Sequence, residues 1–237
     1  VRVERNQRVA GARNLGILAS TGDYITFLDD DDVRLPQSLD LQIKMLDTAP
    51  HVGLVYGQVL EGDQHCAPTG EFYPLQCPQG DVFWALLERN FIPCGTAVFR
   101  RSCLYRVGLL DEAIPGVDDW DLWLRISEMY QVGAIEQPVA IWRRPNSNSG
   151  QGSSKPVDLI LQSIWLLRHK WLKLPRAAEA SRRQRLNVVK KFSDSVVEHL
   201  FWEMANSVLA GKFNEAKINL ETLLRLHPSS ILKVIRK

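Results

Sequence analysis

Two groups of aspartates in this sequence have the residue type and spacing that could carry out chemistry. The first is the run Asp29–Asp32, and the second comprises Asp118, Asp119 and Asp121. Oxygen-rich clusters of this kind suit hard divalent cations, which relieve the repulsion between neighbouring carboxylates. In a single domain, one cluster could hold a metal ion on substrate phosphates while the other supplies a general base for a hydroxyl group.

Each cluster also has a simpler interpretation. Asp29–Asp32 could be a solvated acidic turn, and the run alone does not decide between a turn and a metal site. Acids at the start of a helix are stabilised by the helix dipole by about 0.3–1 kcal/mol each, which would explain Asp121 and one neighbour. The presence of both clusters in one domain favours the catalytic interpretation.

The elements that must position these clusters alternate between strands and helices. Tyr24–Leu28 is a continuous apolar run bounded by turns, which predicts a buried parallel strand that ends directly at the first cluster. The second cluster begins a helix predicted over Asp119–Tyr130. The other predicted elements are helices at Asn14–Ala19, Leu39–Leu46, Gly80–Leu87 and Ser102–Val107, and strands at Val52–Val59, Gly95–Phe99 and Val132–Trp142. This alternation indicates an α/β layered domain, whose ligands lie at the carboxyl ends of strands.

The last third of the chain differs from the rest. Residues 145–156 have the composition of a linker, and from Val157 onward only helical periodicity is found. Residues 1–154 carry 13 basic and 20 acidic side chains, whereas residues 155–237 carry 16 and 7. We therefore expect an α/β domain over 1–150 and an all-helical region over 157–237. Within the latter, Leu209–Pro228 resembles part of a single tetratricopeptide-type helix pair.

The basic helical region has three conceivable partners. Its clusters Arg182-Arg183-Gln184-Arg185 and Lys190-Lys191 lack interleaved aromatic residues, so nucleic acid is not expected. The helix predicted over Val157–Leu172 could touch an anionic membrane surface at the inner face of a membrane. We favour the alternative that it packs against the first domain while its basic side chains extend to solvent.

Composition and cysteine pattern exclude several classes of protein. With 45% apolar and 24% charged residues and a net charge of +2, the chain is not expected to be disordered. No apolar run approaches the roughly 18 residues of a membrane-spanning helix, and we expect no signal peptide, because the residues after Val1 form no apolar segment. The four cysteines have no C-x-x-C spacing, which predicts reduced thiols in a cytoplasmic protein.

Further motifs surround the two clusters in a fixed order. Arg13-Asn14-Leu15-Gly16 precedes the strand that ends in the first cluster, and Pro36 follows it. Downstream lie segments 53–57, 90–93, 99–102, 107–112, 118–125 and 142–144. This series, over about residues 5–150, resembles glycosyltransferase family 2 of the GT-A fold, a Rossmann-like layered α/β architecture.

The resemblance implies roles for individual residues. Asp29 and Asp31 would hold Mg²⁺ or Mn²⁺ on the diphosphate of a nucleotide-sugar donor, and Asp30 would lie beside the ribose or sugar. Asp119 would deprotonate the acceptor hydroxyl in an inverting single displacement, with Asp118 as the second candidate. The remaining expected contacts are Arg13, Arg143 and Arg144 with the donor, and Trp120 and Asn90 with a glycan or glycoconjugate acceptor.

The sequence departs from the family in two places. The first two strands of the family, which cradle the nucleotide base, are not found, so Val1 is expected to enter near the third strand. Pro145-Asn146 occupies the stretch in which the family often carries a histidine.

The function that we predict is that of an inverting glycosyltransferase of polysaccharide biosynthesis. Because of these departures, two other functions stay open. One is a remnant that cannot bind donor and acts as an interaction module through its basic helical tail. The other is a metal-dependent phosphohydrolase, which the ordered series from Arg13 to Arg125 disfavours.

Overall fold

A computed structural model describes residues 2–143 and 156–226 of the chain. The chain divides into two compact units, Val1–Ser154 and Lys155–Lys237. The stretch that we interpret as a linker, residues 145–156, lies outside the described residues except at its end.

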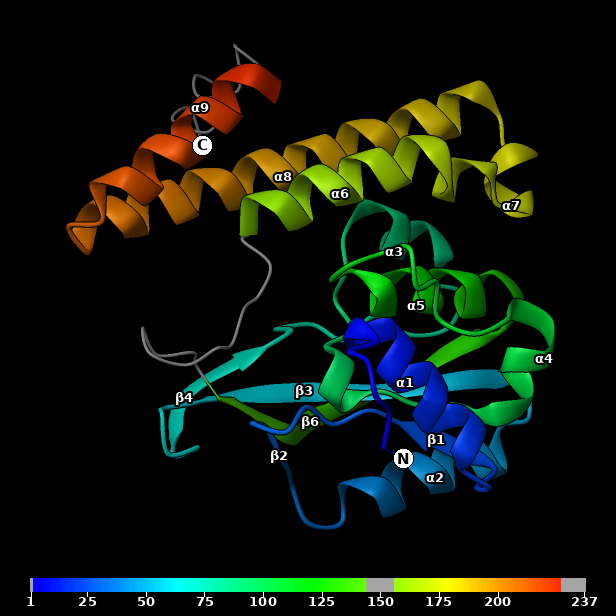
Figure 1. The fold of residues 1–237 in the computed structure, drawn as a ribbon. Coiled ribbons are helices and arrows are strands. Elements are labelled where there is room, and N and C mark those ends of the chain that lie inside the picture. Colours follow the sequence, from blue (N-terminus) through cyan, green and yellow to red (C-terminus); the bar gives the residue numbers. More distant parts are fainter. Residues whose placement is uncertain (1, 144–155, 227–237) are drawn as a thin grey trace. The chain divides into compact units, whose positions relative to one another are not determined.

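The first unit is built on a six-stranded mixed sheet (Figure 1). Its strands run in the order β1-β5-β3-β6-β2, and β4 pairs with β3. Only β3 and β6 pair in parallel, and β1 pairs antiparallel with β5, so the prediction of a parallel strand at Tyr24–Leu28 is wrong. The strands are β1 (Tyr24–Thr26), β2 (Val33–Arg34), β3 (Val52–Gly62), β4 (Pro68–Tyr73), β5 (Val98–Arg100) and β6 (Gln131–Arg143).

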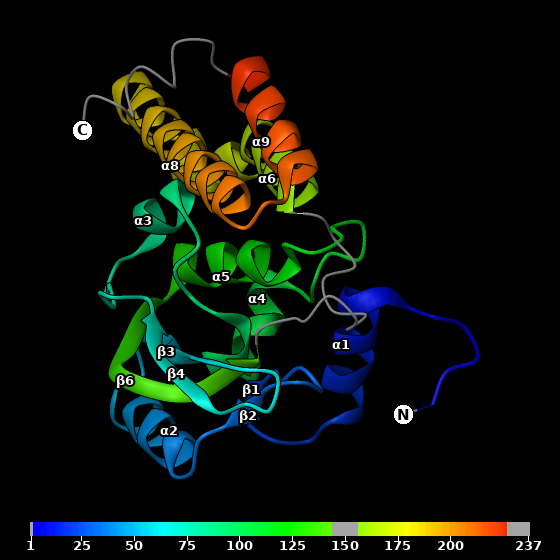
Figure 2. The same cartoon turned by 90° about the vertical axis from the view of Figure 1, so that its left-hand side faces the viewer.

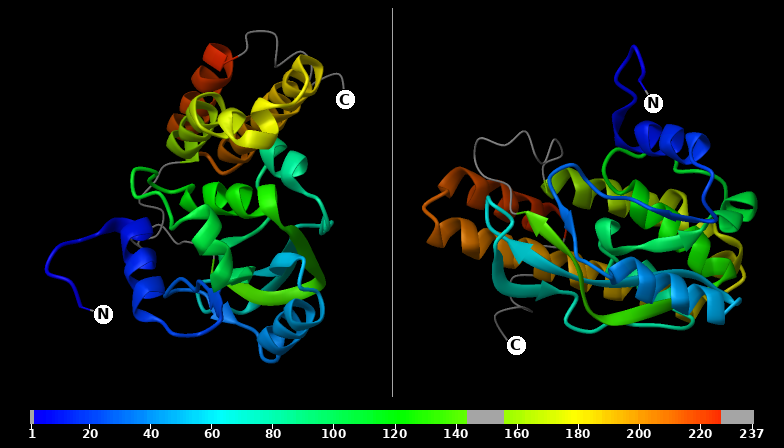
Figure 3. Two further views of the ribbon diagram at one scale, coloured as in Figure 1. Left: turned by 90° about the vertical axis from the view of Figure 1, so that its right-hand side faces the viewer. Right: turned by 90° about the horizontal axis from the view of Figure 1, so that it is seen from below.

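Helices cover both faces of this sheet, which confirms the α/β class. Figures 1 and 2 show α5 (Asp118–Met129) on one face and α2 (Ser38–Thr48) on the other, and Figure 3 shows α2 lying over the sheet when seen from below. The remaining helical elements are α1 (Arg8–Ala19), α3 (Phe83–Glu88), η1 (Cys94–Thr96), η2 (Arg101–Cys103) and α4 (Leu104–Val107).

The two helix layers bury different parts of the core. Under α2, Leu46 packs with Val52, Val55 and Val98 of the sheet. Gly133 of β6 lets α2 approach closely, since a Cβ atom there would lie 2.6 Å from the sulfur of Met45. On the opposite face, Trp123 of α5 packs against Phe27 and Phe99. Phe27 of this aromatic cluster stands two residues before the first aspartate run.

The second unit is helical throughout its described residues, as predicted. It comprises α6 (Pro156–His169), η3 (Trp171–Lys173), α7 (Pro175–Ala178), α8 (Arg182–Leu209) and α9 (Phe213–Leu226). Ile160 of α6, Leu200 of α8 and Leu223 of α9 share one buried cluster. Among the described residues, no helix has the length and apolar character needed to cross a membrane.

Helices α8 and α9 form a hairpin in which α9 turns back along α8 (Figures 1 and 2). Gly211, with a φ of 71°, makes the left-handed turn between them. Of the tetratricopeptide-like pattern, Ala216 is buried, Phe213 is 69% exposed, and Pro228 lies outside the described residues. Helix α8 is 28 residues long, twice the 14 residues of α9, so the two helices are not an evenly matched pair.

Candidate active site

Arg13 of α1 joins the two aspartate clusters. Its Nη2 donates to Asp29 Oδ1 at 3.0 Å and its Nη1 donates to Asp118 Oδ2 at 3.1 Å. The guanidinium group also lies 5.2 Å from the centre of the Phe27 ring. Burial by itself would lower the pKa of Arg13, but the charges of Asp118 and Asp29 help to raise it above its ordinary value. A permanent positive charge therefore stands between residues that are far apart in the sequence.

Asn14, the next residue of α1, fixes the loop that leads into α5. Its Nδ2 donates to the carbonyl oxygen of Leu110 and to Glu112 Oε1, each at 3.0 Å. Its Oδ1 accepts from the backbone N–H of Leu110 at 3.0 Å. Since Asn14 is 5% exposed, these bonds are shielded from water. The neighbours Arg13 and Asn14 thus set α1 against α5.

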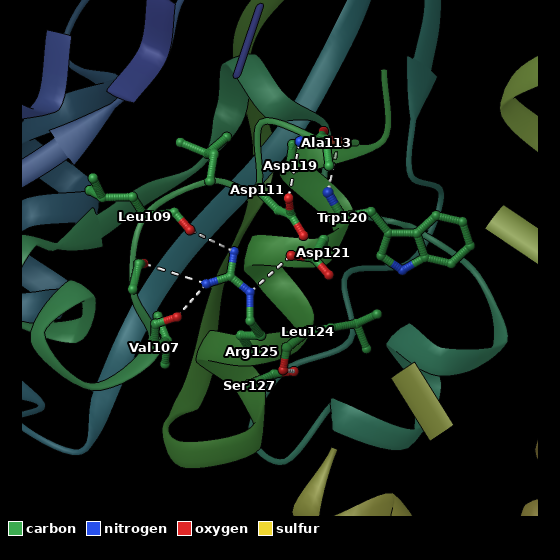
Figure 4. Close-up of polar contacts among 12 residues, drawn as sticks. Val107, Leu109, Asp111, Ala113, Asp119, Trp120, Asp121, Leu124, Arg125 and Ser127 are labelled. Carbon is green, nitrogen blue, oxygen red and sulfur yellow. Dashed lines mark hydrogen bonds and ion pairs between the residues drawn. The ribbon is translucent and has the colours of Figure 1, made fainter. Parts of the chain in front are cut away.

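Arg125 holds the same loop from the side of α5 (Figure 4). Its Nε donates to Asp121 Oδ2 at 2.9 Å, and Nη2 donates to the carbonyl oxygen of Leu109 at 3.0 Å. Its Nη1 donates to the carbonyl oxygen of Val107. The Asp121 side chain is fully buried in this ion pair. Asp121 is therefore a structural residue, as its position at the start of a helix suggested.

Asp119 lies in the first turn of α5 and is half-buried. Its Oδ1 accepts from the backbone N–H of Trp120 at 2.7 Å (Figure 4). Burial, and next the neighbouring charge of Asp118, raise the pKa of Asp119 from 3.8 to about 6, although Arg13 opposes this rise. A carboxyl group with this pKa is ionised at neutral pH and is better matched to proton transfer than an ordinary aspartate.

The first aspartate run is anchored to the end of β6. Asp32 Oδ1 accepts from the backbone N–H of Arg143 at 3.0 Å, and Asp31 Oδ2 lies 3.7 Å from Arg143 Nη2. Burial, together with the charges of Asp31 and Asp29, raises the pKa of Asp32 to about 6 against the hydrogen bond from Arg143. The four aspartates 29–32 therefore carry more negative charge than Arg13 and Arg143 neutralise.

Two cavities adjoin this loop, and Asp29 lines both. One has a volume of about 640 Å³ and lies between α1 and β1, where Arg13 and Asp30 line it. The other has a volume of about 310 Å³ and is bounded by β3, β4, β6 and the η1 turn. Asp29 is therefore placed to contact ligands in both cavities.

The η1 turn that borders the smaller cavity is held by buried side chains. Gln42 of α2 donates to the carbonyl oxygen of Thr96 at 2.7 Å, and Arg34 donates to Gln42 Oε1 at 2.9 Å and to the carbonyl oxygen of Gly95. Burial and the charge of Asp119 hold the pKa of the Cys94 thiol in this turn well above its ordinary value. The thiol is protonated at neutral pH, which does not suit a nucleophile.

The structure brings most of the predicted site residues together. Arg13, Asp29, Asp118 and Asp119 form one connected group, and Asp31 and Arg143 adjoin it through the loop. Asp30 is exposed and lines the cavity between α1 and β1. Arg144 lies outside the described residues.

The two residues expected to contact the acceptor, Trp120 and Asn90, both make hydrogen bonds within the protein. Trp120 is only 9% exposed and its indole N–H donates to the carbonyl oxygen of Leu86 at 2.8 Å, so its ring offers no face to a sugar. Asn90 turns towards its own loop, where its Oδ1 accepts from the backbone N–H of Ile92 at 3.1 Å. The packing of α5 against α3 therefore makes the expectation for Trp120 wrong, whereas the expectation for Asn90 stays a prediction.

Three residues of the site had no role assigned from the sequence. Asp32, Cys94 and Trp142 all line the smaller cavity. Asp32 belongs to the predicted aspartate run, and Trp142 stands next to Arg143, so proximity in sequence would have indicated both. Cys94 directly follows the family-like segment 90–93, but the turn that places its side chain is held by the distant Arg34 and Gln42.

Comparisons with known proteins find similarity to glycosyltransferases. Residues 1–108 match the model of glycosyl transferase family 2. A protein of Rickettsia bellii (strain RML369-C) described as an uncharacterized glycosyltransferase is 29% identical over 150 residues, covering 62% of this chain and 21% of that protein. The amylovoran biosynthesis glycosyltransferase AmsE of Erwinia amylovora is 27% identical over 129 residues, covering 54% of this chain and 47% of AmsE.

The fold also matches a solved structure. The crystal structure of S. aureus TarS 1–349 in complex with UDP-GlcNAc superimposes with a TM-score of 0.53 at 12% identity, covering 95% of this chain and 74% of that one. At this identity the match concerns the fold. The chain spans less than half the length of the two curated relatives named above.

Proposed function

We propose that this chain is a glycosyltransferase of family 2, whose model its residues 1–108 match. It would transfer a sugar from a nucleotide-sugar donor to a hydroxyl group of a glycan or glycoconjugate. The observation that carries this proposal is the bridge that Arg13 makes between Asp29 and Asp118. It supports a single site in which a donor-side loop faces an acceptor-side carboxylate.

Of the two candidates for the general base, the geometry favours Asp119. Asp118 is 2% exposed and committed to Arg13, so it serves to position the arginine. Asp119 is half-buried, and the pKa of about 6 suits a base that works near neutral pH. In the proposed reaction Asp119 takes the proton of the acceptor hydroxyl as that oxygen attacks the anomeric carbon. The bond from this carbon to the diphosphate breaks, and the configuration inverts.

The aspartate run also fits a divalent cation. Arg13 engages one oxygen of Asp29, and Arg143 approaches one oxygen of Asp31, so each carboxylate keeps an oxygen for a metal ligand. Burial is the main cause of the raised pKa of Asp32, and the charges of Asp31 and Asp29, which a cation would offset, add to it. The described residues offer no group of three or more metal-binding side chains, so a cation here would complete its coordination with phosphates and water.

Each partner of the reaction then has named residues. Asp29 and Asp31 would hold Mg²⁺ or Mn²⁺, which supplies charge that stabilises the nucleoside-diphosphate leaving group. Arg143, 32% exposed at the end of β6, is available to the phosphates, and Asp30 to the ribose or sugar. We propose a uridine-diphosphate sugar as the first donor to test, since TarS was crystallised with UDP-GlcNAc. The relation to AmsE supports a polysaccharide acceptor.

Calorimetric titration of the protein with nucleoside diphosphates and Mn²⁺ tests the donor site. We expect binding of at least one nucleotide, weakened about tenfold or more in Asp31→Ala, which is a loss of at least about 1.4 kcal/mol. The matched control is Asp40→Ala, which removes an exposed aspartate from α2. Absence of binding to every nucleotide would support the rival interpretation as an interaction module, and equal binding by Asp31→Ala would refute the metal assignment.

A further inference from the structure

The positive charge of the second, helical unit is concentrated at one end. Residues 168–191, from the end of α6 to the start of α8, contain nine lysines and arginines and a single acidic residue, Glu179. Residues 192–226 contain three lysines and arginines and five acidic residues. Figure 1 shows the end of α6, the short α7 and the start of α8 at the same end of this unit. The described part of the unit is therefore strongly basic at that end and slightly acidic elsewhere.

A small cavity lies at this basic end, between η3 and the start of α8. It has a volume of about 290 Å³ and is lined by Leu172, Arg182, Arg185, Leu186 and Val189. The last four occupy positions i, i+3, i+4 and i+7 of α8, so they share one side of the helix. None of the described residues that line the cavity is acidic. The cavity thus combines aliphatic walls with two guanidinium groups.

Another side of α8 packs this helix into its unit, and the side with the cavity is left to solvent. Val188 and Phe192 are each 2% exposed, whereas Leu186 is 57% exposed. Arg182 and Arg185 are exposed on either side of it along the helix. An exposed apolar side chain among basic ones is typical of a helix that lies in a membrane interface.

An anionic phospholipid satisfies both the charged and the apolar groups of this surface. Guanidinium groups bind phosphate through paired, charge-assisted hydrogen bonds, and an anionic bilayer attracts every lysine and arginine held near it. The aliphatic walls and Leu186 are stabilised when they leave water for the boundary between headgroups and acyl chains. A nucleic acid or a free phosphate ion would use the arginines alone and would leave Leu186 in water.

We infer that the basic end of the second unit binds the surface of an anionic phospholipid bilayer. Arg182 and Arg185 bind the lipid phosphates, and Leu186 enters the boundary between headgroups and acyl chains. The contact lies on the start of α8 rather than on the helix over Val157–Leu172 that the sequence suggested. This inference goes beyond the proposed transfer reaction and does not depend on it.

Cosedimentation of the protein with lipid vesicles tests the inference. One set of vesicles contains phosphatidylcholine alone, and the other contains phosphatidylcholine and phosphatidylglycerol in equal amounts. We expect binding to the anionic vesicles to be about tenfold tighter or more, and to weaken in concentrated salt, which screens exposed charges. In Arg182→Gln/Arg185→Gln the dissociation constant for anionic vesicles should rise about tenfold or more, which is a loss of at least about 1.4 kcal/mol.

Matched variants separate this surface from the net charge and apolar exposure of the whole chain. Lys212→Gln/Lys217→Gln removes the same charge from two exposed lysines that pair with glutamates on or next to α9, and binding should stay within about twofold of wild type. Leu186→Ser should raise the dissociation constant for anionic vesicles about fivefold. Leu209→Ser is its control, since Leu209 is an 86% exposed leucine at the other end of α8, and it should leave binding unchanged.

Several results would overturn the inference. It is wrong if the protein binds neutral and anionic vesicles alike, if the arginine and lysine double variants behave alike, or if Leu186→Ser binds as Leu209→Ser does. It is also wrong if soluble poly-glutamate binds as tightly as the anionic vesicles, because the surface is then one for acidic proteins. None of these measurements involves a nucleotide, so the proposed function is tested separately.

Discussion

Replacing Asp119 by asparagine should stabilise the protein at neutral pH, although it removes the proposed base. Folding places this carboxyl group where burial and Asp118 disfavour its charge, which raises its pKa from 3.8 to about 6. The folded state therefore binds the Asp119 proton more tightly than the unfolded state does. Asparagine has the shape of the protonated acid, carries no charge, and keeps an oxygen that can accept from the Trp120 N–H.

The size of the effect follows from the shift in pKa. Each pKa unit corresponds to about 1.4 kcal/mol, so a rise of about two units makes ionised Asp119 cost about 3 kcal/mol. Below pH 4 both states hold the proton and the cost vanishes, whereas above pH 6 it is complete. The free energy of unfolding of Asp119→Asn should thus exceed that of wild type by about 3 kcal/mol at pH 7 and by nearly nothing at pH 3.5.

Urea unfolding of both proteins at a series of pH values measures this difference. Asp40→Asn serves as the control, because Asp40 is an exposed aspartate in the first turn of α2, where its replacement should change stability by no more than about 1 kcal/mol at any pH. A difference between Asp119→Asn and wild type that does not grow between pH 4 and pH 6 would refute the reasoning. So would a loss of stability in the variant at pH 7.

Three other outcomes are expected. Arg13→Gln leaves the buried Asp118 carboxylate without the arginine that pairs with it, so the free energy of unfolding in urea should fall by about 3–5 kcal/mol. Adding Asp118→Asn should restore part of this loss. If the losses of the two substitutions simply add, the ion pair between Arg13 and Asp118 is contradicted. Gly57→Ala should lower the free energy of unfolding by about 1–3 kcal/mol, because the new Cβ atom would lie 2.6 Å from Val139. Gly16→Ala lies in open space on α1 and should raise the free energy of unfolding by about 0.5–1 kcal/mol. Thermal or urea unfolding measures both, and changes of the same sign would contradict the packing around Gly57. The transfer rate should fall by about tenfold per pH unit below pH 6, where Asp119 becomes protonated, and a rate that is flat down to pH 4 would exclude it as the base.

Much of the fold could be predicted from local patterns in the sequence. The helices α1, α2 and α5 and the long strands β3 and β6 all follow from hydrophobic periodicity and turn residues. Strand β4, Pro68–Tyr73, escaped because it is exposed throughout and contains proline and glycine. The direction of β1 also escaped, since an apolar run does not reveal which neighbour a strand pairs with.

The site was less predictable than the fold. The aspartates can be recognised as candidate site residues from their type and spacing, but the role of each depends on contacts with residues distant in the sequence. Asp118 and Asp119 are adjacent in sequence, but only Asp118 forms an ion pair with Arg13. We therefore assign Asp118 a structural role and propose Asp119, with its raised pKa, as the base. Trp120 and Trp142 show the same limit, because packing buries one and the sheet register exposes the other.

The most direct test of the proposed function is a transfer assay with the purified protein, Mn²⁺, a panel of nucleotide sugars and a panel of glycan acceptors. We expect acceptor-dependent release of nucleoside diphosphate from at least one donor, and a rate about 10²–10⁴-fold lower in Asp119→Asn with the affinity for nucleotide unchanged. Release that is equally fast in Asp119→Asn would contradict the assignment of the base. No release from any donor by the wild-type protein would contradict the proposed function itself.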